Sequence, residues 1–182
     1  MRAVILVVAA TTDELRGADG AETLVCGVGP VDAAARTAAS LASTPSAALI
    51  HVGIAGARTF VEPVLVIGSE AVYCDADDAR WIELRLPADP ALFQAARRAL
   101  PDAAVTPIGT SARVGGSSGC EVEAMEGYAV LRAAALAGVP AIEIRVLANA
   151  IGEPDRSRWR FEDAKAVLAG ALPQLIAEVA RA

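Results

Sequence analysis

Apolar runs alternate with amphipathic segments along this chain. Several runs are apolar on both faces, such as AVILVV and AALIHVGI. Strands of this kind lie inside a sheet that helices cover on both sides. The predicted strands are Ala3–Ala9, Thr23–Val28, Ala48–Ile54, Val64–Tyr73, Trp81–Leu86, Ala104–Ile108 and Ala141–Leu147.

Helical periodicity fills most of the intervals between these strands. Gly29 and Pro30 precede one helical pattern, and another ends at Gly138, with Pro140 just beyond. The predicted helices are Val31–Ala42, Pro90–Leu100, Glu123–Ala137 and Phe161–Ala180.

The alternation predicts an α/β fold with three layers, α/β/α, around a central mixed and mostly parallel sheet. The polar turn at residues 74–78 separates two strand patterns and favours an antiparallel excursion within that sheet. The length of 182 residues is typical of one domain, which we expect to span residues 1–182.

Composition narrows the classes of partner. Hydrophobic residues make up 54% of the chain and aromatic residues only 4%, so aliphatic side chains must fill the core. The net charge of −6 disfavours nucleic acid and anionic membranes, and a small molecule is the expected ligand. The three cysteines form no C-x-x-C pair, which favours reduced thiols in a cytoplasmic protein and gives no sign of a metal site.

Ligands of parallel α/β sheets bind at the carboxyl ends of strands, so the residues there are candidates for chemistry. Asp13 and Glu14 follow the first strand, and the last strand ends in Arg145–Asn149. Glycines follow the second and third strands without the G-x-G-x-x-G spacing of a dinucleotide site. Tight turns explain these glycines as well as a ligand loop does.

Several candidates also have structural interpretations. Asn149 could cap a turn, and Arg145 could form an ion pair with Glu143. His51 is the only histidine, and a lone histidine on a strand is more often structural than catalytic. Glu126 differs, because it lies on a stretch expected to face the core, where a carboxylate needs a partner or a ligand.

Taken together, six segments resemble the nucleoside phosphorylase and nucleosidase superfamily, and within it the futalosine hydrolases most closely. The segments are spread over nearly the whole chain. The most specific is the pairing of Glu123-x-Met125-Glu126-Gly127 with the later Arg145-x-x-x-Asn149. The six are VVAATTDEL, CGVGPVDAAART, HVGIAGA, SEAVYCDAD, VEAMEGYAV and EIRVLANAIGEPDRSRWR.

The resemblance implies hydrolysis of a nucleoside N-glycosidic bond without a metal or organic cofactor. Glu14 matches the general base that activates water, and Met125 and Glu126 match the grip on the ribose. Asn149 would face the leaving purine. The resemblance implies catalytic roles for Glu14, Asn149 and Arg145, and substrate binding by Ile54, Ala55, Gly56, Val114, Glu123, Met125 and Glu126.

The identity of residue 149 bears on the substrate. Methylthioadenosine/S-adenosylhomocysteine nucleosidases carry Asp where this chain has Asn149, and an amide can donate to the N7 or O6 of a 6-oxopurine. The resemblance therefore implies futalosine as substrate, hypoxanthine as leaving group and a place in menaquinone biosynthesis. The apolar Ile54 cannot hold a phosphate oxygen, which favours water as nucleophile.

Two alternatives remain open. The chain could be a methylthioadenosine/S-adenosylhomocysteine or aminofutalosine nucleosidase that releases adenine. It could also be a nucleoside-binding homologue without turnover. The resemblance further implies a homo-oligomer.

Overall fold

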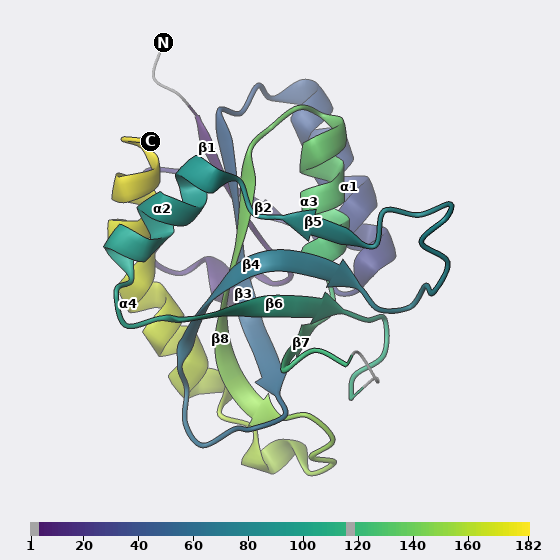
Figure 1. Cartoon of the computed structure of the whole chain (residues 1–182). Helices are drawn as coiled ribbons and strands as arrows, with labels where there is room; N and C mark the ends of the chain where they lie inside the picture. The colour runs from purple at the N-terminus through teal and green to yellow at the C-terminus, as the bar shows by residue number, and fades with distance from the viewer. Residues whose placement is uncertain (1–3, 116–118) are drawn as a thin grey trace.

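A computed structural model describes residues 4–115 and 119–182. Its strands belong to one eight-stranded sheet, and Figure 1 shows the helices on both sides of it. The strands are β1 (Ile5–Ala9), β2 (Glu22–Val25), β3 (Ala48–Ala57), β4 (Leu65–Tyr73), β5 (Arg85–Pro87), β6 (Ala104–Thr110), β7 (Val122–Ala124) and β8 (Ala141–Ala150). The helices are η1 (Thr12–Leu15), α1 (Pro30–Ser43), α2 (Pro90–Ala99), α3 (Gly127–Leu136), η2 (Arg156–Arg158) and α4 (Phe161–Val179).

The expected α/β class and the mixed, mostly parallel sheet are confirmed, but a simple three-layer arrangement is wrong. The sheet runs β2-β1-β3-β7-β6-β4-β5, and β8 pairs with both β3 and β4. Strands β3, β7, β6, β4 and β8 therefore close into a ring. The pairs of β4 with β5, β4 with β8, and β3 with β7 are antiparallel. The expected antiparallel excursion is the pairing of β4 with β5.

Strand β7 lies where the sequence pattern predicts the start of a helix. Residues 122–124 pair with β3 on one side and β6 on the other, and α3 begins only at Gly127. Three residues carry too little periodicity to reveal a strand, and the pairing partners are distant in sequence. The short strand closes the ring and brings Glu126 to the helix start.

The apolar core divides between the two faces of the sheet. Helices α2 and α4 cover one face, where Ile50, Val52 and Ile144 are fully buried. Helices α1 and α3 cover the other, where Leu49 and Val130 are fully buried. A third cluster gathers small and branched side chains from the ring strands. No helix in residues 4–115 and 119–182 is long and apolar enough to span a bilayer.

The contact between α3 and β8 makes Gly127 sensitive to substitution. A Cβ on Gly127 would lie 2.1 Å from Oε2 of the buried Glu143, which cannot move away freely. We expect Gly127→Ala to lower the free energy of unfolding by about 1–3 kcal/mol, as overpacking of a core does. Urea denaturation, followed by circular dichroism, measures this change.

Gly170→Ala is the matched control. Gly170 lies within α4, and its Cβ would meet no neighbouring atom within 4 Å. Alanine in an open helical position stabilises by about 0.5–1 kcal/mol relative to glycine. A Gly127→Ala protein as stable as Gly170→Ala would contradict the close packing of α3 on β8.

Candidate active site

A cavity of about 860 Å³ opens at the carboxyl ends of β1, β3 and β8, beside the start of α3. This is the position expected for a ligand site in an α/β sheet. Its lining residues are Ala10, Thr11, Asp13, Glu14, Val28, Ile54, Ala55, Gly56, Val114, Gly115, Glu123, Ala124, Met125, Glu126, Asn149, Ile151, Gly152, Glu153, Pro154, Arg156, Trp159, Phe161 and Lys165.

Glu14 lines this cavity and is 5% exposed. The sequence Thr11-x-x-Glu14 has the spacing of a capping box, in which the glutamate reaches back to the helix start. Its Oε2 accepts hydrogen bonds from the Thr11 N–H at 3.0 Å and from the Thr11 hydroxyl at 2.8 Å. Its Oε1 accepts from the Ile54 N–H at 3.1 Å. These bonds fix the carboxylate between β1 and β3.

Glu126 is another buried carboxylate of the cavity, immediately before α3. Its Oε1 accepts a hydrogen bond from the Gly29 N–H at 3.0 Å. Its Oε2 lies 3.6 Å from Nη2 of Arg145. Each oxygen of Glu126 therefore has a partner, as expected for a buried carboxylate.

Arg145 does not line the cavity, although the family resemblance implies a catalytic role for it. Its side chain is 1% exposed and lies behind the cavity wall. Its Nε donates to Glu143 at 2.8 Å, so the ion pair considered from the sequence exists. Its Nη2 lies 2.6 Å from Nε2 of His51. Burial acts to lower the pKa of Arg145, but Glu143 and Glu126 hold it above its usual value.

His51 and Glu143 contact Arg145, and the pKa of each is shifted because each is buried and faces the charge of Arg145. Burial, and then the charge of Arg145, hold the pKa of His51 well below its usual value. Burial raises the pKa of Glu143, and Arg145 opposes that rise. Oε2 of Glu143 accepts no hydrogen bond from the described residues, while its Oε1 binds Arg145.

Asn149 lines the cavity near the end of β8 and is 8% exposed. Its Nδ2 donates to the Ala150 carbonyl at 2.9 Å. A primary amide has two N–H donors and one carbonyl acceptor. The second N–H and the carbonyl of Asn149 can therefore serve a ligand.

The structure gathers most of the predicted site residues around one cavity. Besides the three already described, the predicted binding residues there are Ile54, Ala55, Gly56, Val114, Glu123 and Met125. Of all predicted site residues, Arg145 is the one absent from the lining.

Sequence reasoning assigned no site role to an aromatic and charged part of the lining. Trp159 and Phe161 lie with their ring centroids 5.2 Å apart, and the guanidinium of Arg156 lies over the Trp159 ring at 5.6 Å. Lys165 on α4 pairs with Asp13 at 3.3 Å. Their position along the chain could have indicated them, because residues 151–161 directly follow the strand that carries Asn149.

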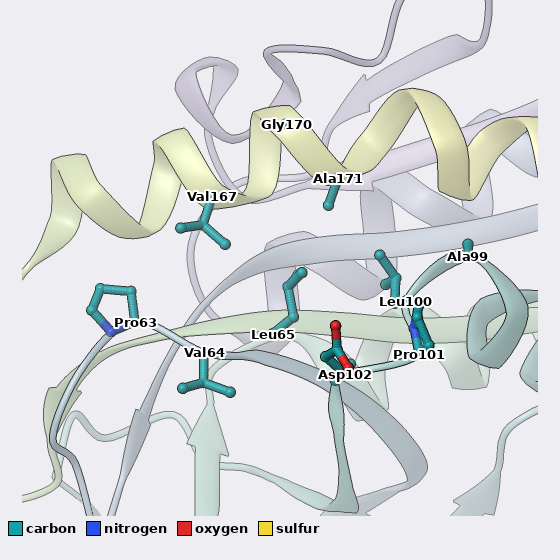
Figure 2. A pocket seen from close by; sticks show the side chains of 11 residues that line it. Pro63, Val64, Leu65, Ala99, Leu100, Pro101, Asp102, Val167, Gly170 and Ala171 are labelled. Atoms are coloured by element: carbon teal, nitrogen blue, oxygen red, sulfur yellow. The ribbon is translucent and has the colours of Figure 1, made fainter.

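A second hollow of about 470 Å³ lies between α4, the end of α2 and the start of β4 (Figure 2). Figure 2 shows Val167 and Ala171 of α4 above Leu65 and Leu100. Asp102 is the one titratable residue in its lining. A single exposed carboxylate among aliphatic side chains offers no catalytic pair, so the first cavity is the candidate site. The described residues contain no cluster of His, Cys, Asp and Glu suited to a metal ion.

Sequence comparison relates this chain to known proteins. The profile of the phosphorylase superfamily matches residues 19–181. A futalosine hydrolase from Streptomyces coelicolor is 34% identical over 185 residues, an alignment that covers 86% of this chain and 79% of the relative.

Solved structures share the fold. Futalosine hydrolase of Helicobacter pylori superposes with a TM-score of 0.86 at 15% identity, covering 98% of this chain and 99% of the other. The Streptococcus pneumoniae MTA/SAH nucleosidase in complex with 8-aminoadenine gives a TM-score of 0.84 at 18% identity, covering 95% and 98%. The family match spans nearly the whole chain and agrees with the observed fold, and the chain belongs to the phosphorylase superfamily.

Proposed function

We propose that this protein hydrolyses the N-glycosidic bond of futalosine and releases hypoxanthine. The observation that carries the proposal is that the buried carboxylates of Glu14 and Glu126 and the amide of Asn149 lie around one cavity. The similarity to a futalosine hydrolase over most of the chain supports the substrate.

Glu14 is the general base of the proposed reaction. A carboxylate has about four acceptor positions, and described residues occupy three of them on Glu14. The remaining position on Oε1 can accept a hydrogen bond from water. Glu14 takes a proton from this water as the water oxygen bonds to C1′ and the bond from C1′ to the base nitrogen breaks. Its negative charge also stabilises the positive charge that develops on the ribose.

Water fits this site better than phosphate does. The N–H of Ile54 already donates to Glu14, so it is not available to a phosphate oxygen. The Ile54 side chain offers no donor in its place. A phosphate dianion beside the Glu14 carboxylate would also be repelled. These three features support hydrolysis rather than phosphorolysis.

Glu126 and Met125 hold the ribose in this proposal. An ionised carboxylate accepts two hydrogen bonds side by side, which matches a pair of neighbouring ribose hydroxyls. Glu126 is oriented by the Gly29 N–H and by Arg145 before any substrate binds. Glu123, Ala55 and Gly56 complete the lining around the sugar and base, and Val114 contributes an apolar contact.

Asn149 contacts the leaving base. Its N–H not bound to Ala150 can donate to N7 or O6 of a 6-oxopurine, and it stabilises negative charge that develops as the base departs. The ligand of this site is thus a small nucleoside.

We also propose that the protein forms a homo-oligomer and is located in the cytoplasm. Its hydrolysis of futalosine would be a step in menaquinone biosynthesis.

The first test measures the base released from futalosine, methylthioadenosine and inosine, each with and without phosphate. We expect hypoxanthine from futalosine at a rate that phosphate does not change. Adenine from methylthioadenosine would instead identify an adenine-releasing nucleosidase, and dependence on phosphate would contradict hydrolysis.

Glu14→Gln tests the general base. The amide retains the shape of the side chain but cannot take a proton, so we expect kcat for futalosine to fall by about 10²–10⁴-fold. Binding of the nucleoside, measured by calorimetry, should change little. If wild type and Glu14→Gln bind futalosine equally and neither hydrolyses it, the protein is a binding homologue without turnover.

Asn149→Asp tests the assignment of the base contact. A carboxylate accepts hydrogen bonds and suits the 6-amino group of adenine, whereas the amide also donates to a 6-oxopurine. We expect the ratio of kcat/KM for futalosine to that for aminofutalosine to fall by about tenfold or more, as for loss of one good hydrogen bond. Asn149→Ala is the control, and it should lower kcat/KM for both nucleosides without the tenfold fall in their ratio. An unchanged ratio in Asn149→Asp would disprove the role of Asn149.

A further inference from the structure

Three charged or polar side chains lie together behind the cavity wall, and the reaction does not use them directly. They are His51 on β3 and Glu143 and Arg145 on β8, all 1% exposed or less. Strands β3 and β8 run parallel in a register that pairs His51 with Glu143 and Gly53 with Arg145. Because residues two apart on a strand share a face, all three side chains project toward α3 from the same side of the sheet.

Gly53 provides the space that the guanidinium occupies. A Cβ at this position would lie 2.3 Å from Nη1 of Arg145 and 2.9 Å from Oε1 of Glu14. The guanidinium therefore passes close over the backbone of β3, between His51 on one side and Glu14 on the other. The absence of a side chain at residue 53 brings the charge of Arg145 up to the cavity wall.

His51 accepts a hydrogen bond from Arg145 in a fixed tautomer. Its Nδ1 lies 3.0 Å from the Val8 carbonyl, which can only accept, so Nδ1 carries the proton. Nε2 then presents its lone pair to Nη2 of Arg145 at 2.6 Å. The lowered pKa of His51 keeps the ring neutral in this role.

Glu143 is a second acceptor that holds the guanidinium. Its Oε1 accepts from Nε of Arg145, and its carboxyl group packs against Gly127, the residue after Glu126. An arginine held at Nε and Nη2 cannot rotate about its long axis. Glu126, in turn, has Oε1 on the Gly29 N–H and Oε2 toward Arg145. The direction of the second oxygen therefore depends on where Arg145 is held.

We propose that His51 and Glu143 are positioning residues that fix Arg145, and through it orient the Glu126 carboxylate for the ribose hydroxyls. The inference rests on the proposed function, because it uses the contact between Glu126 and the sugar. It adds a role for two residues that do not contact the substrate. The hydroxyls of the ribose are then recognised by a carboxylate whose angle is set from inside the sheet.

The experiment compares futalosine with 2′-deoxyfutalosine, because the contact at issue is with a ribose hydroxyl. In the wild-type protein we expect a higher kcat/KM for futalosine. His51→Leu and Glu143→Leu keep approximate size but remove the acceptor that holds Arg145. We expect each to lower the preference for futalosine by about tenfold or more, the loss typical of a hydrogen bond to a charged group.

His51→Gln and Glu143→Gln are the matched controls, because each keeps an oxygen that can accept from Arg145. We expect them to retain most of the preference. A purely structural role would lower activity on both substrates equally and leave the ratio unchanged. The thermal unfolding midpoint of each variant identifies those that fold, and either Leu variant is sufficient for the test.

The outcomes separate this inference from the proposed function. If the wild-type protein prefers futalosine and a folded Leu variant keeps that preference, the positioning role is wrong and the proposed function stands. If the Leu and Gln variants lose the preference equally, the acceptor is not the cause and the positioning role is also wrong. If the wild-type protein hydrolyses neither nucleoside, both the proposed function and this inference fail.

Discussion

The buried charge of Arg145 is the constraint on which the candidate site depends. A guanidinium outside water is stable only when acceptors surround it with good geometry, and removal of one partner leaves an uncompensated charge. Here Glu143 and Glu126 provide negative charge, and His51 provides a neutral lone pair. The same charge that needs these partners also holds them in place, so the back of the cavity has one defined arrangement.

The fold supplies this arrangement by joining distant segments of the chain. Strand β3 carries His51 and the Ile54 N–H, its neighbour β8 carries Glu143 and Arg145, and β1 leads into Glu14. The short strand β7 closes the ring and delivers Glu126 to the start of α3. Each candidate side chain is therefore attached to a paired strand or to the first turn after one, which holds it in place.

The sequence predicted the secondary structure well wherever local periodicity was strong. The helices expected at Pro90–Leu100 and Phe161–Ala180 are observed within one residue of their bounds, because capping and amphipathic patterns are local signals. The strand expected at Trp81–Leu86 is observed as Arg85–Pro87 only. The missed strand and the ring depend on pairing between distant residues, for which a single sequence carries little signal.

The sequence by itself determined the α/β class, the positions of most helices and strands, and the chemistry available at their ends. It also required a partner for Glu126, because a carboxylate in an apolar segment cannot be buried alone. Only the tertiary structure decided that the sheet closes through β7 and β8, and that Arg145 lies behind the cavity. It also placed His51 against that guanidinium. The physical reason is that strand register and side-chain contact are set by packing across the whole chain, whereas helix caps and strand patterns are set by neighbours in sequence.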